Sequence, residues 1–224
     1  MKNATRIALV MLAIAIPAFF GIKKLRTNKP SQHAAIPAIN PATAAYNERV
    51  IDTAVSLLRS GYLILRIGIG ADSYILSQMN LHDKTYSHCG IVMIENGKPY
   101  IYHSIGGEDN PDERLRRDEA RFFCSPQHNL GLAIVSYDLD STQVSALHKV
   151  VEDYYRLRPK FDMKFDLATD DQLYCAEFVY KAMNKTMKDT AYIKTNTLYG
   201  HRYVGVDNLF INPHAHIIWK TKFK

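Results

Sequence analysis

Hydrophobic and polar residues follow helical and strand spacings along residues 46–224. Apolar residues three and four positions apart predict helices, which cover Tyr46–Arg59, Ser141 to about Arg158, and Tyr174–Asn184. Shorter apolar runs predict strands over Leu63–Ile67, Leu132–Tyr137 and His216–Lys220. A short helix fits Ala71–Met79, Phe161–Asp171 is predicted as a loop, and Asp112–Arg121 as a solvated helix or loop. Helices beside an antiparallel sheet define an α+β domain, which is the predicted fold class.

A β-hairpin is the clearest local signal in the chain. The β-rich runs His88–Ile94 and Tyr100–Ile105 flank the pair Asn96-Gly97. An Asn-Gly pair between two such runs is the favoured two-residue hairpin turn. We therefore expect two antiparallel strands joined at this pair.

The turn also predicts which side chains share a face of the sheet. If Asn96-Gly97 forms the turn, Glu95 faces Lys98, and His88, Gly90 and His103 lie on one face. His103 is then the diagonal neighbour of His88, within reach of its imidazole, and Gly90 leaves the space between them open. Two imidazoles that meet in this way suit a general base and the group that orients it. The alternative is that each histidine is a satisfied structural residue.

Cys175 is the candidate nucleophile. It lies at the start of the predicted helix Tyr174–Asn184, which the loop residues 170–173 could cap. A thiol in the first turn of a helix lies at the positive end of the helix dipole, which lowers its pKa. A nearby imidazole would hold it as a thiolate, as in cysteine hydrolases. The alternative is an inert core residue, because Cys175 shares a helical face with Phe178 and Val179.

The remaining cysteines and histidines predict no metal site and no cofactor. The chain has three cysteines and no CxxC pair, so a disulfide scaffold and a zinc ribbon are both excluded. Cys89 alternates to the face opposite His88 and is predicted to be core, and a Cys89–Cys124 disulfide stays open. His214 and His216 could share a strand face, but no third ligand accompanies them.

The charge distribution argues against nucleic acid as a partner. The formal net charge is +6, with 28 basic and 22 acidic residues. Six of the bases and none of the acids lie in residues 1–45, which leaves 22 bases against 22 acids in residues 46–224. The predicted domain is therefore formally neutral and lacks the basic footprint of a nucleic-acid-binding surface.

The N-terminal residues form an appendage to this domain. Ile7–Ile22 is a run of sixteen residues without a charge, with basic residues on both sides. Residues 1–26 are therefore predicted to be a signal anchor in a membrane, with a cleaved signal peptide or a soluble core helix as alternatives. Residues 27–45, which contain three prolines, are predicted to be a flexible tether, and residues 46–224 the folded domain.

Several segments together resemble a known family. These are Gly61–Arg66, Tyr86–Val92, Tyr100–His103, Phe161-Asp162 and Tyr174–Val179. They resemble the YiiX/YebB-like branch of the NlpC-type, papain-like cysteine hydrolases, over roughly residues 46–185. In this branch the papain-like domain is circularly permuted, so the histidine precedes the cysteine, as it does here.

The resemblance implies a role for each candidate residue. It implies that Cys175 is the nucleophile, that His88 is the base, and that His103 occupies the third polar position. It also implies a small antiparallel sheet with the nucleophile helix packed against it. The chain departs from the family at Tyr62, where Asp is frequent, at Ala176, where Ser is frequent, and at His103, where many members have Glu. These departures bear on substrate preference.

The expected function follows from this resemblance. It is a thiol-dependent hydrolase that cleaves an amide bond in cell-wall peptides, with peptidoglycan as the expected partner, by Cys-His-His catalysis and without a cofactor. The protein is expected to be membrane-anchored or secreted and extracytoplasmic, with the periplasmic side favoured. Two alternatives stay open: a lipid acyl hydrolase or acyltransferase of the same fold, and a catalytically silent binding module.

Overall fold

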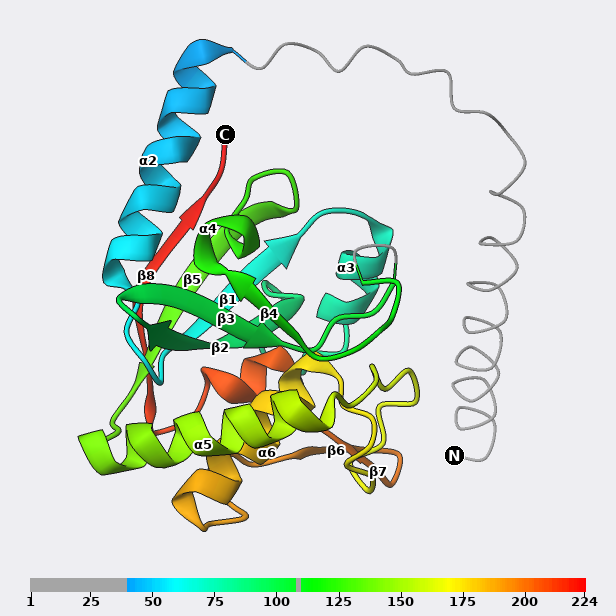
Figure 1. Ribbon diagram of the computed structural model, residues 1–224. Helices are drawn as coiled ribbons and strands as arrows, with labels where there is room; N and C mark the ends of the chain where they lie inside the picture. Colours follow the sequence, from blue (N-terminus) through cyan, green and yellow to red (C-terminus); the bar gives the residue numbers. More distant parts are fainter. Residues whose placement is uncertain (1–39, 108–109) are drawn as a thin grey trace, which may run out of the picture. The chain divides into compact units, whose positions relative to one another are not determined.

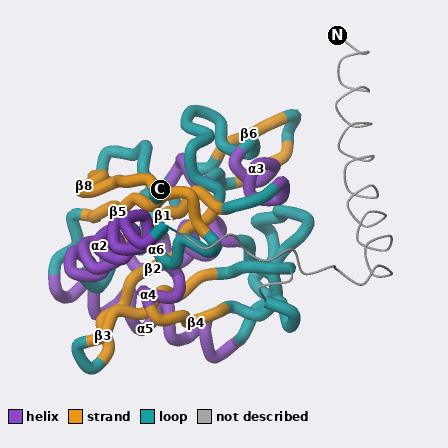
Figure 2. The backbone as a smooth tube through the Cα atoms, turned by 90° about the horizontal axis from the view of Figure 1, so that it is seen from above, coloured by secondary structure: helices purple, strands orange, loops and turns teal. Residues whose placement is uncertain are grey.

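An antiparallel sheet lies at the centre of the computed structural model, which describes residues 40–107 and 110–224 (Figure 1). Its strands are β1 (Leu63–Gly68), β2 (His88–Glu95), β3 (Lys98–His103), β4 (Arg116–Glu119), β5 (Asn129–Tyr137) and β8 (Ala215–Lys222). They lie in the order β4-β3-β2-β1-β5-β8, which Figure 2 shows from above. Two short strands, β6 (Asn196–Leu198) and β7 (His201–Tyr203), form a separate hairpin that the sequence did not predict.

Helices cover both faces of the sheet. They are α2 (Pro41–Leu57), α3 (Ala71–Ser77), α4 (Ala120–Phe123), α5 (Ser141–Leu157), α6 (Cys175–Met187) and the 3-10 helix η1 (Val206–Leu209). The predicted α+β class with an antiparallel sheet is confirmed, as are the helices and strands expected from periodicity. Within the part of the chain that the structure describes, no helix is both long and apolar enough to cross a bilayer.

The N-terminal prediction falls largely on residues 1–39, which lie outside the described residues. Its last part was wrong, because α2 begins at Pro41 and makes residues 41–45 of the expected tether helical. Proline is favoured in the first turn of a helix, where its missing N–H has no intrahelical partner to lose. Ala42, Ala44 and Ala45 then supply the strongest helix-forming residue type.

Successive side chains of the central strands point to opposite faces of the sheet, which divides the core into two clusters. Leu65 and Ile91 belong to a cluster that includes side chains of α5 and α6. Ile64 and Val92 belong to the other cluster, with side chains of α2 and α4. We call these two surfaces of the sheet the α5/α6 face and the α2/α4 face.

The predicted hairpin register is confirmed. Glu95 pairs with Lys98, and the β2–β3 ladder continues to Ile91 opposite Tyr102. The turn residues Asn96 and Gly97 have φ of 49° and 77°, as a type I′ turn requires. The expected strand end at Ile105 was wrong, because β3 ends at His103.

The segment Asp112–Arg121 is not the solvated helix or loop that its mixed charges predicted. It contains β4 and the start of α4, and β4 pairs with β3 along its whole length. All four residues of β4 are charged, so no apolar alternation marks the strand. Side chains of the neighbouring strands contact these charges. Arg117 pairs with Glu95, and the Arg117 guanidinium lies 3.4 Å from the centroid of the Tyr100 ring. An edge strand with this composition resists pairing with another chain.

Two helices are capped by residues other than those expected, which were Ser141 for α5 and the loop 170–173 for α6. The N-cap of α5 is Asp140, whose carboxylate accepts the Gln143 N–H at 2.8 Å, so the cap lies one residue before Ser141. The N-cap of α6 is Tyr174, outside the expected capping loop 170–173. Asp170 instead pairs with a lysine on α6.

Candidate active site

The two predicted histidines meet in the structure. Nε2 of His88 lies 2.9 Å from Nδ1 of His103, and the ring centroids are 5.0 Å apart. Both side chains are buried, and both rings contact Phe123 of α4, which places them on the α2/α4 face. The space beside Gly90 is filled rather than open, because a Cβ there would lie 2.5 Å from Cγ2 of Ile101. Glycine allows β2 and β3 to approach closely where the rings meet.

A third polar residue, which sequence reasoning missed, extends this contact. Nε2 of His103 lies 3.0 Å from Oδ2 of Asp118 on β4. Arg116 donates from Nε and Nη2 to the other carboxylate oxygen, at 3.2 and 2.8 Å. Because His103 pairs with Arg116 across the ladder, Asp118 is its diagonal neighbour. The same pairing rule would have found Asp118 if the segment had been predicted as a strand.

The ionised Asp118 determines which ring nitrogens of His103 and His88 carry a proton. Burial raises the pKa of Asp118, but hydrogen bonds from His103 and Arg116 outweigh burial and lower it. The ionised carboxylate can only accept, so Nε2 of His103 carries the proton and its Nδ1 accepts from Nε2–H of His88. Nδ1 of His88 is then left with a free lone pair, which is the state a general base needs.

Both imidazoles are held neutral. Burial lowers the pKa of His88 well below its usual value, and the charges of Arg66 and His103 lower it further. Burial lowers the pKa of His103 to about 4, although Asp118 opposes the shift. The assignment of ring protons above therefore holds at neutral pH.

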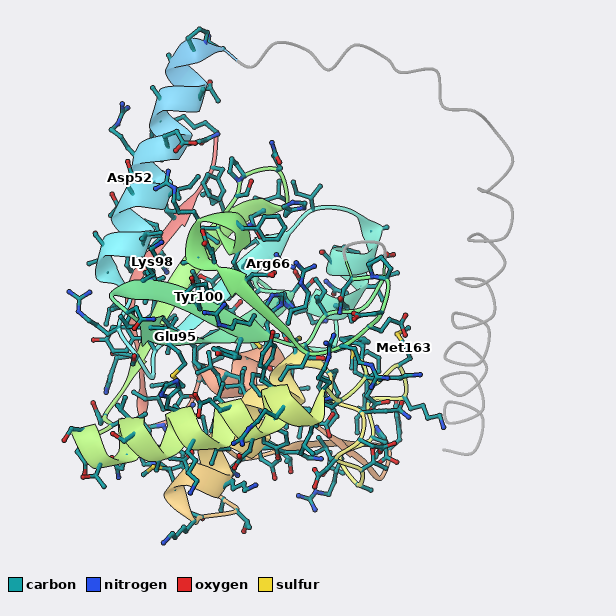
Figure 3. The ribbon with its side chains drawn as sticks, viewed as in Figure 1. Asp52, Arg66, Glu95, Lys98, Tyr100 and Met163 are labelled. Carbon is teal, nitrogen blue, oxygen red and sulfur yellow. The ribbon has the colours of Figure 1, made fainter. Side chains whose placement is uncertain are left out.

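Arg66 supplies a positive charge at the end of the sheet where β2 begins, opposite the hairpin turn marked by Glu95 and Lys98 (Figure 3). It pairs with His88 across β1 and β2, and its guanidinium lies 4.7 Å from the centroid of the Phe123 ring. It was part of the family resemblance but carried no predicted role.

Cys175 is the first residue of α6 and belongs to the cluster on the α5/α6 face. A side-chain hydrogen bond from Cys89 lowers the pKa of its thiol; burial raises it, and the backbone N–H groups of Ala176 and Cys89 lower it further. These contacts bring the thiol to the strand residue that follows His88. In the described residues, the thiol's hydrogen bonds come from Cys89 and Ala176, and neither imidazole is a partner.

The start of α6 is fixed by a buried carboxyl group. Oε2 of Glu177 accepts the backbone N–H of Tyr174 at 3.2 Å, and Oε1 lies 3.0 Å from Nζ of Lys181. Burial raises the pKa of Glu177 to about 7, and Lys181 opposes that rise. The Tyr174 hydroxyl in turn accepts the N–H of Val204 at 2.8 Å. These bonds hold the residue that precedes Cys175.

The start of β2 is tied to the C-terminal part of the domain. Asn80 donates to the carbonyl of Tyr86 and accepts the N–H of Val206, both at 2.8 Å. Oδ2 of Asp207 accepts the N–H of His82 at 2.7 Å. The loop between α3 and β2 is thereby anchored to η1, and the strand that carries His88 begins at a fixed position.

Other candidates from the sequence are separated in the structure. Cys89 is buried core as predicted, and Cys124 lies in the cluster on the other face of the sheet; all three cysteines are free thiols. His214 stacks on Tyr192 with ring centroids 4.2 Å apart, whereas His216 lies 3.1 Å from Asp138. The last two histidines therefore have different partners.

Comparisons with known proteins give the fold and not the chemistry. No protein-family model matches the sequence, and no curated protein matches it. Among solved structures, the fold resembles that of the metalloprotein YiiX from Escherichia coli O157:H7, with a TM-score of 0.60 and 19% sequence identity. The match covers 73% of this chain and 98% of that one. The expected likeness to YiiX therefore holds for the fold.

YiiX is described as a metalloprotein. In residues 40–107 and 110–224, no group of three or more His, Cys, Asp or Glu side chains is placed to hold a metal ion. His88, His103 and Asp118 instead hydrogen-bond to one another in series. This arrangement does not fit a metal ion.

Proposed function

We propose that this protein is a thiol-dependent hydrolase of the permuted papain-like type, with Cys175 as the nucleophile and His88 as the general base. The observation that carries the proposal is the series Asp118–His103–His88, whose hydrogen bonds leave a lone pair on Nδ1 of His88. The series ends next to Cys89, the residue that contacts the Cys175 thiol. A nucleophile, a base and an orienting group are the parts that such catalysis needs.

Each group has a defined step in this reaction. The sulfur of Cys175 attacks the substrate carbonyl carbon, and Nδ1 of His88 takes the thiol proton and returns it to the leaving group. Water, activated by the same imidazole, then hydrolyses the thioester. The backbone N–H of Cys175 supplies part of the oxyanion hole. His103 and Asp118 hold the His88 ring and its tautomer.

The proposed substrate is an amide bond in a cell-wall peptide, which is the substrate that the family resemblance implies. An acyl ester of a lipid is a second candidate, because exposed apolar side chains surround α3: Ile69, Tyr74, Ile75 and Leu81. This segment follows the end of β1, where the Gly68 N–H donates to Oγ of Ser87 at 3.0 Å, directly before His88. Exposed apolar side chains at this end of β1 suit a hydrocarbon chain.

The test compares wild-type protein with Cys175→Ala on purified cell-wall peptides and on phospholipid vesicles. We expect Cys175→Ala to lose at least about 1000-fold in kcat/KM, because the nucleophile is removed. Cys124→Ala is the matched control, a buried thiol on the opposite face of the sheet, and should keep its activity. Comparable hydrolysis by Cys175→Ala would show that the nucleophile is wrongly assigned. Lack of turnover, together with lack of labelling by a thiol-directed probe, would instead support the silent binding module.

We further propose that residues 1–26 hold the domain at a membrane, on its extracytoplasmic side. The proposal is supported by the uncharged run Ile7–Ile22 and its basic flanks. Full-length protein should partition with membranes, whereas a chain that begins at Asn40 should not. Full-length protein recovered in the soluble fraction with its N-terminus intact would contradict the anchor.

A further inference from the structure

Cys89 and Cys175 face each other between β2 and α6. Both belong to the cluster on the α5/α6 face, and the Cys89 thiol is a hydrogen-bond partner of the Cys175 sulfur. Cys124, the remaining cysteine, belongs to the cluster on the other face. The pairing left open by the sequence, Cys89 with Cys124, is therefore replaced by a neighbouring pair that includes the proposed nucleophile.

The two thiols of this pair differ in exposure and in acidity. Cys175 is 7% exposed, whereas Cys89 is fully buried. Burial raises the pKa of the Cys89 thiol, and its hydrogen bond to Cys175 raises it further. Cys175 is therefore the more acidic of the two thiols, and it is the one with any contact with solvent. A thiol of lowered pKa beside a second thiol is the arrangement of a redox-sensitive cysteine and its resolving partner.

We propose that Cys89 is a resolving cysteine, which forms an intramolecular disulfide with Cys175 when a peroxide oxidises the nucleophile. The inference deepens the proposed function, because it assigns a reversible modification to the same thiol. It explains why a fully buried cysteine faces the nucleophile at the position after the base. A disulfide would block the attack on substrate and protect Cys175 from further oxidation.

The chemistry is a two-electron oxidation of the dithiol by hydrogen peroxide. The Cys175 thiolate attacks one peroxide oxygen, an S–O bond forms, the O–O bond breaks, and hydroxide leaves to yield sulfenic acid. The Cys89 sulfur then attacks the Cys175 sulfur, an S–S bond forms, and the S–O bond breaks. The released oxygen leaves as water with the Cys89 proton. Dithiothreitol returns both residues to thiols.

The experiment measures the disulfide directly in the full chain. Purified protein is treated with increasing hydrogen peroxide, and free thiols are alkylated after denaturation. We expect the number of free thiols to fall from three to one, with a loss of about 2 Da and a peptide pair that joins Cys89 to Cys175. Cys124→Ala should give the same linkage. Dithiothreitol should restore both thiols.

Cys89→Ala and Cys89→Ser test the protection of the nucleophile, with circular dichroism to confirm that each variant folds. We expect both variants to convert Cys175 to sulfinic and sulfonic acid at peroxide concentrations that leave it recoverable in wild type. Equal irreversible oxidation in wild type and both variants, or a linkage through Cys124, would overturn the inference. Mass spectrometry detects the disulfide without a substrate, so the two proposals can fail separately. A disulfide without hydrolysis would contradict only the proposed function. Hydrolysis without a disulfide would contradict only this inference.

Discussion

The two faces of the central sheet carry the two halves of the candidate site, and they are assembled in different ways. On the α2/α4 face, His88, His103 and Asp118 come from three adjacent strands and are hydrogen-bonded in series. On the α5/α6 face, Cys175 is delivered by a helix from much later in the chain and contacts Cys89. Strand register thus fixes the protonation of the proposed base, whereas helix packing fixes the position of the proposed nucleophile.

Of the changes considered, removal of the proposed base should lower kcat/KM the most. We expect His88→Ala to lower kcat/KM by about 10²–10⁴-fold, because that is the usual contribution of general acid–base catalysis. The thiol keeps its contacts with Cys89 and Ala176, so Cys175 should still be alkylated by iodoacetamide. His148→Ala, on the exposed side of α5, is the matched control. Unchanged turnover in His88→Ala would show that the histidines and the carboxylate on the strands take no part in the reaction.

The buried imidazoles should also make the fold sensitive to acid. The pKa of His103 falls from its usual 6.5 to about 4 in the folded protein. Between these pH values the unfolded chain binds a proton that the folded chain does not, so the free energy of unfolding falls as pH falls. A shift of this size corresponds to about 3 kcal/mol at most. His88, whose pKa is also lowered, acts in the same direction.

Urea unfolding between pH 7 and pH 4 checks this prediction, with His103→Gln as the comparison. The variant should lose less stability over this range than wild type. Glu177 on the helix side has the opposite sign: its pKa rises from 4.5 to about 7, so its contribution is present below about 4.5 and is lost as pH rises through about 7. Glu177→Gln should remove that second component. Parallel curves for wild type and His103→Gln would argue against a buried neutral imidazole.

A smaller effect is expected from the orienting histidine. His103→Ala leaves the base in place but free to rotate, so we expect a loss of about 10- to 100-fold in kcat/KM, below that of the base. His103→Gln and His103→Glu should retain more activity, because each can still accept a hydrogen bond from His88. The three variants are compared by kcat/KM and by the pH dependence of Cys175 alkylation. A His103→Ala variant with an unchanged rate and an unchanged alkylation profile would show that the ring contact has no role in the proposed catalysis.

The sequence predicted the two histidines on the β2–β3 hairpin, but it did not predict the carboxylate beside them. The Asn96-Gly97 turn is a local signal, so it fixed the register and brought His88 and His103 together. Asp118 was missed because its strand is entirely charged and exists through pairing with β3, which no local pattern reveals.

The helix half was predicted only as far as its own periodicity reached. The apolar face of α6 was correct, and the helix starts at Cys175, one residue after the predicted start at Tyr174, because both features depend on one segment. The residue that contacts the thiol could not be predicted, because it depends on how α6 packs against β2, far away in the sequence. The capping groups were missed for a related reason: Glu177 caps from within the helix, rather than from the loop before it.

The smallest expected effect distinguishes two ways of losing the carboxylate of Asp118. In Asp118→Asn, the donors of Arg116 should hold the amide oxygen in place of Oδ1, which turns the NH₂ group toward Nε2 of His103. His103 must then accept at Nε2 and carry its proton on Nδ1, so His88 accepts at Nε2 and its own proton moves to Nδ1. The tautomer of His88 with a lone pair on Nδ1 therefore becomes the less populated one.

Asp118→Ala removes the control of the tautomer without inverting it. We therefore expect Asp118→Asn to lose about tenfold in kcat/KM and Asp118→Ala less than that, although Asn is the closer match in shape. Asp52→Asn, at an exposed ion pair with Arg121, is the matched control. Nitrogen-15 chemical shifts of the two rings, which differ between protonated and unprotonated nitrogens, report the tautomer directly. If Asp118→Ala were the more damaged variant, and the His88 tautomer were the same in both, the carboxylate would act by packing or charge rather than by directing the proton.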